Sequence, residues 1–228
     1  MRALVKGWQP VERIYGSRRF KVFESRGAIL ICGGIGSEAA HRAAEVAVPL
    51  YQPQLLLSAG FAGALDQSLK VGQAFWPRVV IDASDGSRTE AASGQGSLVS
   101  FSAVAGPGQK VKLATAYGAQ AVDMEAAAVA RTARAHGIAF AAVKAISDEA
   151  SFEMPEMQRF VTKDGQFRAA AFAGFAVVRP WLWAGLMRLE RNSAQAAQAL
   201  CRELKRYLQK AGQPVAPELQ SASRVERN

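Results

Sequence analysis

Short apolar runs alternate with segments of helical periodicity through the first two thirds of the chain. Apolar runs of strand length occupy residues 28–32, 53–65, 72–83, 98–104 and 138–147. Helical periodicity follows the glycine turn at 33–36 and returns over 123–136, where Gly137 ends it. Such alternation predicts an α/β domain around a mixed, mostly parallel sheet.

Polar stretches and prolines divide the rest of the chain. Residues 82–97 are rich in Gly and Ser and indicate a loop, and Pro77 places the preceding run near a sheet edge or bulge. The most apolar segment, 169–187, is split by Arg179 and Pro180 into runs shorter than the ~20 residues that span a bilayer. We interpret it as two packed helices joined at the proline, with an interfacial helix on a membrane surface as the alternative.

Apolar side chains then recur at helical spacing as far as Leu208. Residues 212–228 are polar and are expected to form a disordered tail. The pattern therefore indicates a single domain over residues 1–211, with its C-terminal helices within 166–211.

The net charge of +9 first suggests a nucleic-acid partner, but its distribution argues against one. The excess lies at the ends: residues 1–27 hold seven basic and two acidic side chains, residues 188–228 hold eight and four, and the centre is neutral. The ends also lack a motif in which aromatic and basic residues alternate. Two cysteines and two histidines exclude a disulfide framework and a histidine-rich metal site, and no signal peptide opens the chain, so we expect a cytoplasmic protein without a metal.

Three carboxylates stand beside apolar elements. Asp123 and Glu125 open the Ala-rich helix, and Asp148 follows the buried run at 138–147. Carboxylates are rarely buried unless they are paired or used, so these positions indicate a site. The structural alternative is that Asp123 and Glu125 complement the positive end of their helix and that Asp148 caps the next one.

Small residues at the strand ends provide room for a ligand. In parallel sheets ligands gather beyond the carboxyl ends of the strands, and small or acidic residues end the strands of this chain at 33–36, 59–63 and 147–148. The glycine turn at 33–36 suggests a dinucleotide, but Ala39 stands where that fingerprint requires a third glycine. We therefore disfavour a nicotinamide cofactor and expect the main chain to approach another ligand closely.

The residue types suggest separate tasks at such a site. Asp148, partly buried and oriented by the Ser147 hydroxyl, is expected to deliver a proton near neutral pH. Glu125 is expected to accept hydrogen bonds from sugar hydroxyls, and Met124 to pack on a sugar face.

Four segments resemble, in order and spacing, the motifs of one family. They are CGGIGSEAA at 32–40, YQPQLLLSAGFAGALDQSLKVGQAF at 51–75, AVDMEAAAVA at 121–130 and VKAISDEA at 143–150. Together they resemble the nucleoside phosphorylase/nucleosidase superfamily, most closely its 5′-methylthioadenosine/S-adenosylhomocysteine nucleosidase branch. The resemblance implies a three-layer α/β/α fold around a mixed, mostly parallel central sheet.

The resemblance also implies a role for each motif residue. Asp148 would protonate the purine ring nitrogen so that the base leaves neutral, and Ser147 would orient it. Glu125 would bind the ribose 2′ and 3′ hydroxyls, and Met124 would pack against the ribose. The remaining implied contacts are to the substrate, from Phe61, Ala62, Gly63, Val104 and Ala105, and near the nucleophile, from the turn of Gly34 and Gly36.

Three departures from the family pattern concern the nucleophile. Phe61 stands where the family commonly has a serine, and the approach LLLSAG lacks the arginine of phosphorolytic members, which favours water over phosphate. The family's first strand and the glutamate that activates water have no counterpart, because MRALVKGWQPVERIYG resembles the segment located after them in family members. Glu12 and Glu24 lie too far downstream to replace that glutamate. We therefore expect a sequence that starts at an internal methionine or is truncated, with weak activity.

The expected function is hydrolysis of the N-glycosidic bond of an adenine nucleoside such as 5′-methylthioadenosine or S-adenosylhomocysteine. Two alternatives stay open. One is phosphorolysis, by a purine nucleoside phosphorylase or an enzyme of the adenosylhopane type, and the other is nucleoside binding without turnover. The expected partner is a small-molecule purine nucleoside, with no nucleic acid, cofactor or membrane span, and we expect a homo-oligomer.

Overall fold

The computed structural model describes residues 4–16, 18–153 and 182–211, together with a few residues between the last two ranges. Seven strands in this part of the chain form the central sheet, in the order β5-β10-β4-β9-β8-β6-β7. Their bounds are β4 Leu55–Ala64, β5 Ala74–Phe75, β6 Val79–Asp82, β7 Arg88–Glu90, β8 Ser97–Ser100, β9 Ala121–Asp123 and β10 Ala139–Asp148.

The sheet is mixed, as the pattern predicts. The longest pairing, between β10 and β4, is parallel, and so are the pairings of β6 with β8 and of β8 with β9. The short edge strands β5 and β7 are antiparallel to their neighbours, and β9 meets only the end of β4, also antiparallel.

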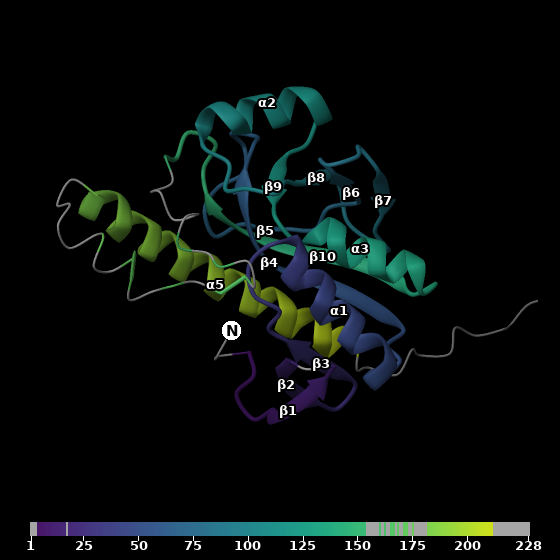
Figure 1. Ribbon diagram of the computed structural model, residues 1–228. Helices are drawn as coiled ribbons and strands as arrows, with labels where there is room; N and C mark the ends of the chain where they lie inside the picture. Colours follow the sequence, from purple (N-terminus) through teal and green to yellow (C-terminus); the bar gives the residue numbers. More distant parts are fainter. Residues whose placement is uncertain are drawn as a thin grey trace, which may run out of the picture.

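Helices cover both faces of the central sheet (Figure 1). Their bounds are α1 Ser37–Tyr51, α2 Pro107–Tyr117, α3 Ala126–Ala135 and α5 Trp183–Ala211. The alanines of α1 and α3 pack in one core cluster with Ala142 and Ile146 of β10, whereas α5 packs against Val143 and Ala145 on the opposite face. α2 covers β6 and β8 on the α5 side. This alternation along β10 produces the expected three-layer α/β/α arrangement.

Local sequence explains where α2 and α3 begin and end. α2 starts at Pro107, whose fixed φ suits the first helical position, and ends before Gly118, which has φ 60°. The pattern does not predict α2, because few of its side chains are buried. α3 begins at Ala126, three residues later than expected, since Asp123 still belongs to β9 and its carboxylate accepts the Ala126 N–H.

A second, three-stranded antiparallel sheet lies at the lower end of the molecule in Figure 1. It consists of β1 Gln9–Tyr15, β2 Arg18–Ser25 and β3 Ala28–Ile31. Only β3 was expected, because β1 and β2 are largely exposed and rich in charged residues. Ile29 and Ile31 of β3 pack against the core beneath α1 and α3, which fastens this sheet to the main domain.

The two edges of β4 are paired unequally. Leu55–Gly63 run beside β10, but on the other side only Gly63 and Ala64 pair with a strand, β9. Among the described residues, no strand pairs with the 55–62 stretch on that side.

Two details of the expected pattern were wrong. Residues 82–97 are not loop throughout, because a turn at Asp82–Ser87 returns the chain as the edge strand β7. The run at 72–83 forms two strands, β5 and β6, separated around Pro77, which interrupts the pairing because it has no N–H.

Of the helix pair expected around Pro180, the second run opens α5 at Trp183, whereas most of the first run lies outside the described residues, as does the tail at 212–228. Within the described part of the chain, no helix combines the length and apolar character needed to cross a membrane.

Substitution of Leu98 tests the core between the sheet and α3. Leu98 in β8 is fully buried, so Leu98→Ala should lower the free energy of unfolding by about 2–5 kcal/mol through lost burial and a residual cavity. Urea unfolding followed by circular dichroism measures this. Val111→Ala is the control: Val111 is 67% exposed on α2, and its replacement should change stability by less than about 0.5 kcal/mol. Equal effects would contradict the assigned core.

Candidate active site

The carboxyl ends of β4 and β10 border a cavity of about 360 Å³. Nearly all residues singled out from the sequence line it: Gly34, Phe61, Ala62, Gly63, Val104, Ala105, Met124, Glu125, Ser147 and Asp148. Gly36 is not part of the lining, but its N–H donates to Glu125. The fold thus brings four distant segments of the sequence to one place.

Asp148 ends β10 at the inner part of this cavity. Its Oδ1 accepts a hydrogen bond from Ser147 Oγ at 2.6 Å, and its Oδ2 lies 2.5 Å from Lys110 Nζ. Asp148 is only 4% exposed, so it is buried more deeply than the sequence suggests. The ammonium of Lys110 takes the place of the water that would otherwise solvate this carboxylate.

Glu125 is the N-cap residue of α3 rather than a member of its first turn. Its Oε1 accepts the Gly36 N–H at 2.7 Å, from the residue that precedes α1, and its Oε2 accepts the Met124 N–H at 3.2 Å. Burial raises the pKa of Glu125, and the neighbouring Asp123 adds to the increase, while Lys144 and the two N–H groups oppose it. The carboxylate is held from two sides by main chain and still faces the cavity.

Asp123 and Lys144 form a second buried ion pair in the wall of the cavity. Lys144 Nζ lies 2.8 Å from Asp123 Oδ2 and donates to Ser58 Oγ at 3.0 Å. Asp123 also accepts hydrogen bonds from Ser100 Oγ and from the Ala126 N–H that opens α3. Of the three acidic residues, Asp123 therefore has the structural role that the sequence left open for it.

The sequence interpretation missed both lysines. Lys144 could have been found, because it is the single charged residue within the apolar run 138–147 and such a charge requires a partner. Lys110 left no such mark: it shares the short, weakly patterned α2 with the exposed Lys112, and its partner is 38 positions away.

The cavity combines charged and apolar walls. Phe61 is 40% exposed and Ile35 is 37% exposed, and both line this cavity beside Met124. Among the described lining residues the charged groups are three carboxylates and two lysines, and each lysine is already paired with a carboxylate. No cluster of His, Cys, Asp and Glu suited to a metal ion occurs in the described ranges.

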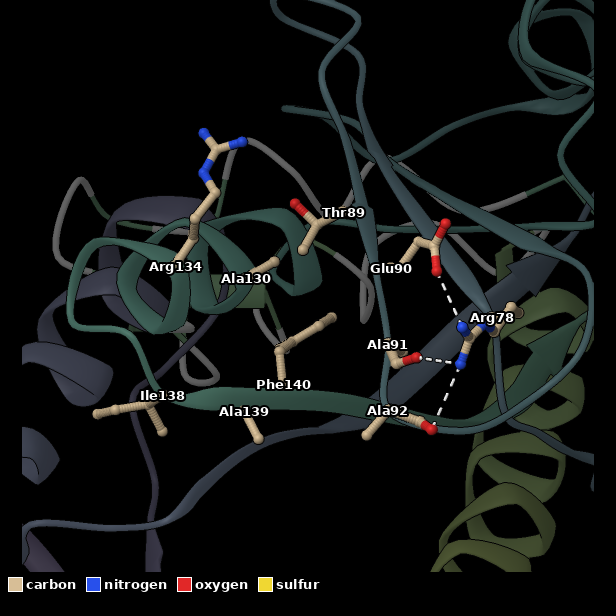
Figure 2. A pocket seen from close by; sticks show the side chains of 10 residues that line it. All are labelled: Arg78, Thr89, Glu90, Ala91, Ala92, Ala130, Arg134, Ile138, Ala139 and Phe140. Carbon is tan, nitrogen blue, oxygen red and sulfur yellow. Dashed lines mark hydrogen bonds and ion pairs between the residues drawn. The ribbon is translucent and has the colours of Figure 1, made fainter.

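A second, larger cavity of about 470 Å³ lies elsewhere, between β7, the end of α3 and the start of β10 (Figure 2). Arg78 lines this cavity, and its guanidinium donates hydrogen bonds to Glu90 and to the carbonyls of Ala91 and Ala92. Arg134 extends away from these groups. Neither buried lysine–carboxylate ion pair lines this second cavity. The volume of a cavity is therefore not sufficient to identify the candidate active site.

Comparison with known proteins gives a family match for one segment of the chain. Residues 102–179, which include β9, α3 and β10, match the model of the phosphorylase superfamily. A search of curated proteins gave no match.

Three solved structures illustrate the shared fold. The futalosine hydrolase of Helicobacter pylori strain 26695 is 18% identical, with a TM-score of 0.66 over 92% of this chain and 94% of its own. The 5′-methylthioadenosine/S-adenosylhomocysteine nucleosidase of Helicobacter pylori is 17% identical, with a TM-score of 0.66 over 92% and 91%. The S-adenosylhomocysteine nucleosidase of Streptococcus pyogenes is 20% identical, with a TM-score of 0.59 over 86% and 87%.

The solved structures that share this fold are a futalosine hydrolase and nucleosidases. The matched segment and the shared fold agree with the resemblance to the nucleoside phosphorylase/nucleosidase superfamily that the four motifs indicated.

Gly63 tests how tightly the Asp148 carboxylate is confined. A Cβ at position 63 would lie 2.7 Å from Asp148 Oδ2 and 3.2 Å from Lys110 Cε, so Gly63→Ala must displace the ion pair. We expect a loss of about 1–3 kcal/mol in unfolding free energy, measured by urea titration. In Gly60→Ala the new Cβ would meet nothing closer than Lys144 Nζ at 3.6 Å, so stability should change by less than about 1 kcal/mol. A Gly63→Ala variant as stable as Gly60→Ala would contradict the described packing.

Proposed function

We propose that the protein hydrolyses the N-glycosidic bond of an adenine nucleoside that carries an apolar 5′ substituent, such as 5′-methylthioadenosine. The observation that carries this proposal is that Asp148 and Glu125 face one cavity, where one carboxylate can serve the base and the other the sugar. A cavity of about 360 Å³ is within the range of small-molecule sites.

The sugar side of the reaction belongs to Glu125. Backbone N–H groups occupy part of its hydrogen-bonding capacity, and the remaining lone pairs are free to accept ribose hydroxyls. As the glycosidic bond breaks, positive charge develops on the sugar, and a nearby carboxylate stabilises it. Met124 in the same wall offers an apolar contact for the ribose face.

The base side belongs to Asp148 and Ser147. A purine departs more easily as a neutral molecule, which requires a proton on a ring nitrogen as the bond to C1′ breaks. The Ser147 hydroxyl holds the Asp148 carboxylate in a defined orientation, and Gly63 leaves room for it. Proton delivery of this kind contributes typically ~10²–10⁴-fold to a rate.

The charges of the cavity support water over phosphate as the nucleophile. Within the described residues, both lysines of the lining are paired with carboxylates, and Glu125 adds a further negative charge. A phosphate dianion entering this wall would meet repulsion with no uncommitted cation to offset it. Water meets no such barrier.

The exposed apolar pair, Phe61 and Ile35, supports a nucleoside with an apolar 5′ group over one with a free 5′ hydroxyl. The Helicobacter pylori nucleosidase of similar fold has been solved with butyl-thio-DADMe-Immucillin-A and, as a mutant, with 5′-methylthioadenosine in the active site. These ligands guide the choice of test substrate.

Release of adenine from 5′-methylthioadenosine tests the reaction directly. We expect the protein to release free adenine, measured by chromatography, without added phosphate. Added phosphate should not increase the rate of release. Phosphate-dependent release would make the protein a phosphorylase, and tight binding without release would make it a nucleoside-binding protein. Futalosine should be included as a substrate because a futalosine hydrolase shares the fold.

Glu125 gives the site a characteristic pH dependence. Its pKa is raised by burial, so as pH falls the carboxylate takes up a proton earlier than an exposed glutamate would, and it then accepts sugar hydroxyls less well. Affinity for a non-hydrolysed adenine nucleoside analogue, measured by calorimetry, should be full above the raised pKa and fall as pH drops through it. The Glu125→Gln variant should bind the analogue about tenfold or more weakly than the wild type. Its affinity should not fall further as the pH is lowered. Glu90→Gln, in the second cavity, is the control and should retain the pH dependence of the wild type.

A further inference from the structure

Lys110 has the features of a functional residue although no motif points to it. It lies in the first turn of α2, yet it is only 2% exposed. Its Nζ donates to Asp148 Oδ2 at 2.5 Å and to the Glu149 carbonyl at 2.6 Å. A lysine at a helix start normally extends into water, because a buried ammonium is unfavourable without an anionic partner. Here both contacts lead to the end of β10, where the base would leave.

The surroundings leave the pair little freedom. The backbone of β4 at Gly63 lies against both side chains, so close that a methyl group there would touch Asp148 Oδ2 and Lys110 Cε. On the other side, Ser147 Oγ holds Asp148 Oδ1. The orientation of the carboxylate therefore depends on two donors, and Lys110 is the charged one.

The contact also determines which group holds the proton. Asp148 Oδ2 accepts a hydrogen bond from the Lys110 ammonium, so the hydrogen between the two groups is donated by the lysine. A departing purine requires a proton. The cationic proton donor closest to this carboxylate is Lys110, a single hydrogen bond away from Asp148.

We propose that Lys110 is a positioning residue that acts through Asp148: it orients the carboxylate and supplies the proton that Asp148 passes to the leaving base. The inference rests on the proposed function, since it names the source of the proton in that reaction.

The proposed step balances without a further reactant. A proton moves from Lys110 Nζ to Asp148 Oδ2 and from this carboxyl group to the purine ring nitrogen. The bond from C1′ to the base breaks and its electron pair stays with the base, which leaves neutral. Water adds to C1′ and releases a proton to solvent, and Lys110 takes up a proton from solvent before the next cycle.

The test compares two substrates with different leaving groups. 5′-Methylthioadenosine needs a proton on its base, whereas p-nitrophenyl β-D-ribofuranoside releases p-nitrophenolate, which leaves without one. Lys110→Met keeps the length of the side chain and removes its charge and proton. We expect kcat for 5′-methylthioadenosine to fall by about 10²–10⁴-fold, with KM changed only a few-fold and cleavage of the nitrophenyl riboside nearly unchanged.

Two variants provide the references. Asp148→Asn removes the carboxyl group that passes the proton to the base. Like Lys110→Met, it should cleave 5′-methylthioadenosine slowly and the nitrophenyl riboside at nearly the wild-type rate. Lys112→Met removes an exposed lysine from the same helix and should match the wild type in both assays. Since Lys110→Met leaves a buried carboxylate unpaired and can impair folding, Lys110→Met/Asp148→Asn is prepared as well. This double variant should be no slower than Asp148→Asn alone, because the two groups act as one unit.

The outcomes separate the two proposals. If Lys110→Met cleaves both substrates more slowly by the same factor, or cleaves both at the wild-type rate, the role assigned to Lys110 is wrong while the hydrolytic function stands. A double variant much slower than Asp148→Asn contradicts it too, because the two losses would then be independent. If the wild type cleaves neither compound, the proposed function itself fails.

Discussion

Two buried lysines impose the constraint on which the cavity depends. Lys110 and Lys144 are almost completely withdrawn from water, and a buried ammonium is tolerated only beside an anion. Each therefore fixes one carboxylate, Asp148 in one case and Asp123 in the other. One of these lysines lies on α2 and the other on β10, and the two neutralised acids form part of the cavity lining.

The three acidic residues of the site consequently differ in kind. Asp123 has a structural role, because it neutralises Lys144 and accepts the N–H of the first residue of α3. Glu125 is held by main-chain N–H groups and has no lysine in direct contact among the hydrogen bonds described for it. Asp148 stands between these cases, paired yet adjacent to open space. Similar residues in one cavity thus acquire different properties from their immediate partners.

The sequence predicted what is periodic or local. The apolar runs at 28–32, 53–65 and 138–147 contain strands, because burial on a sheet leaves a periodic pattern in the sequence. Glycines of the 33–36 turn and of the 59–63 stretch, which lies within β4, line the cavity. The exposed strands β1 and β2 and the weakly patterned α2 left no such pattern. Lys110 was missed for the same reason, since its meaning depends on a partner brought near only by the fold.

The hydrogen bond between the Gly36 amide and Glu125 joins residues that lie 89 positions apart. Neither half of the chain holds the Glu125 carboxylate in this position by itself, because the hydrogen bond needs both segments. A ligand that recognises this carboxylate therefore binds the native state in preference to partly folded states, and by mass action it stabilises the native state against unfolding.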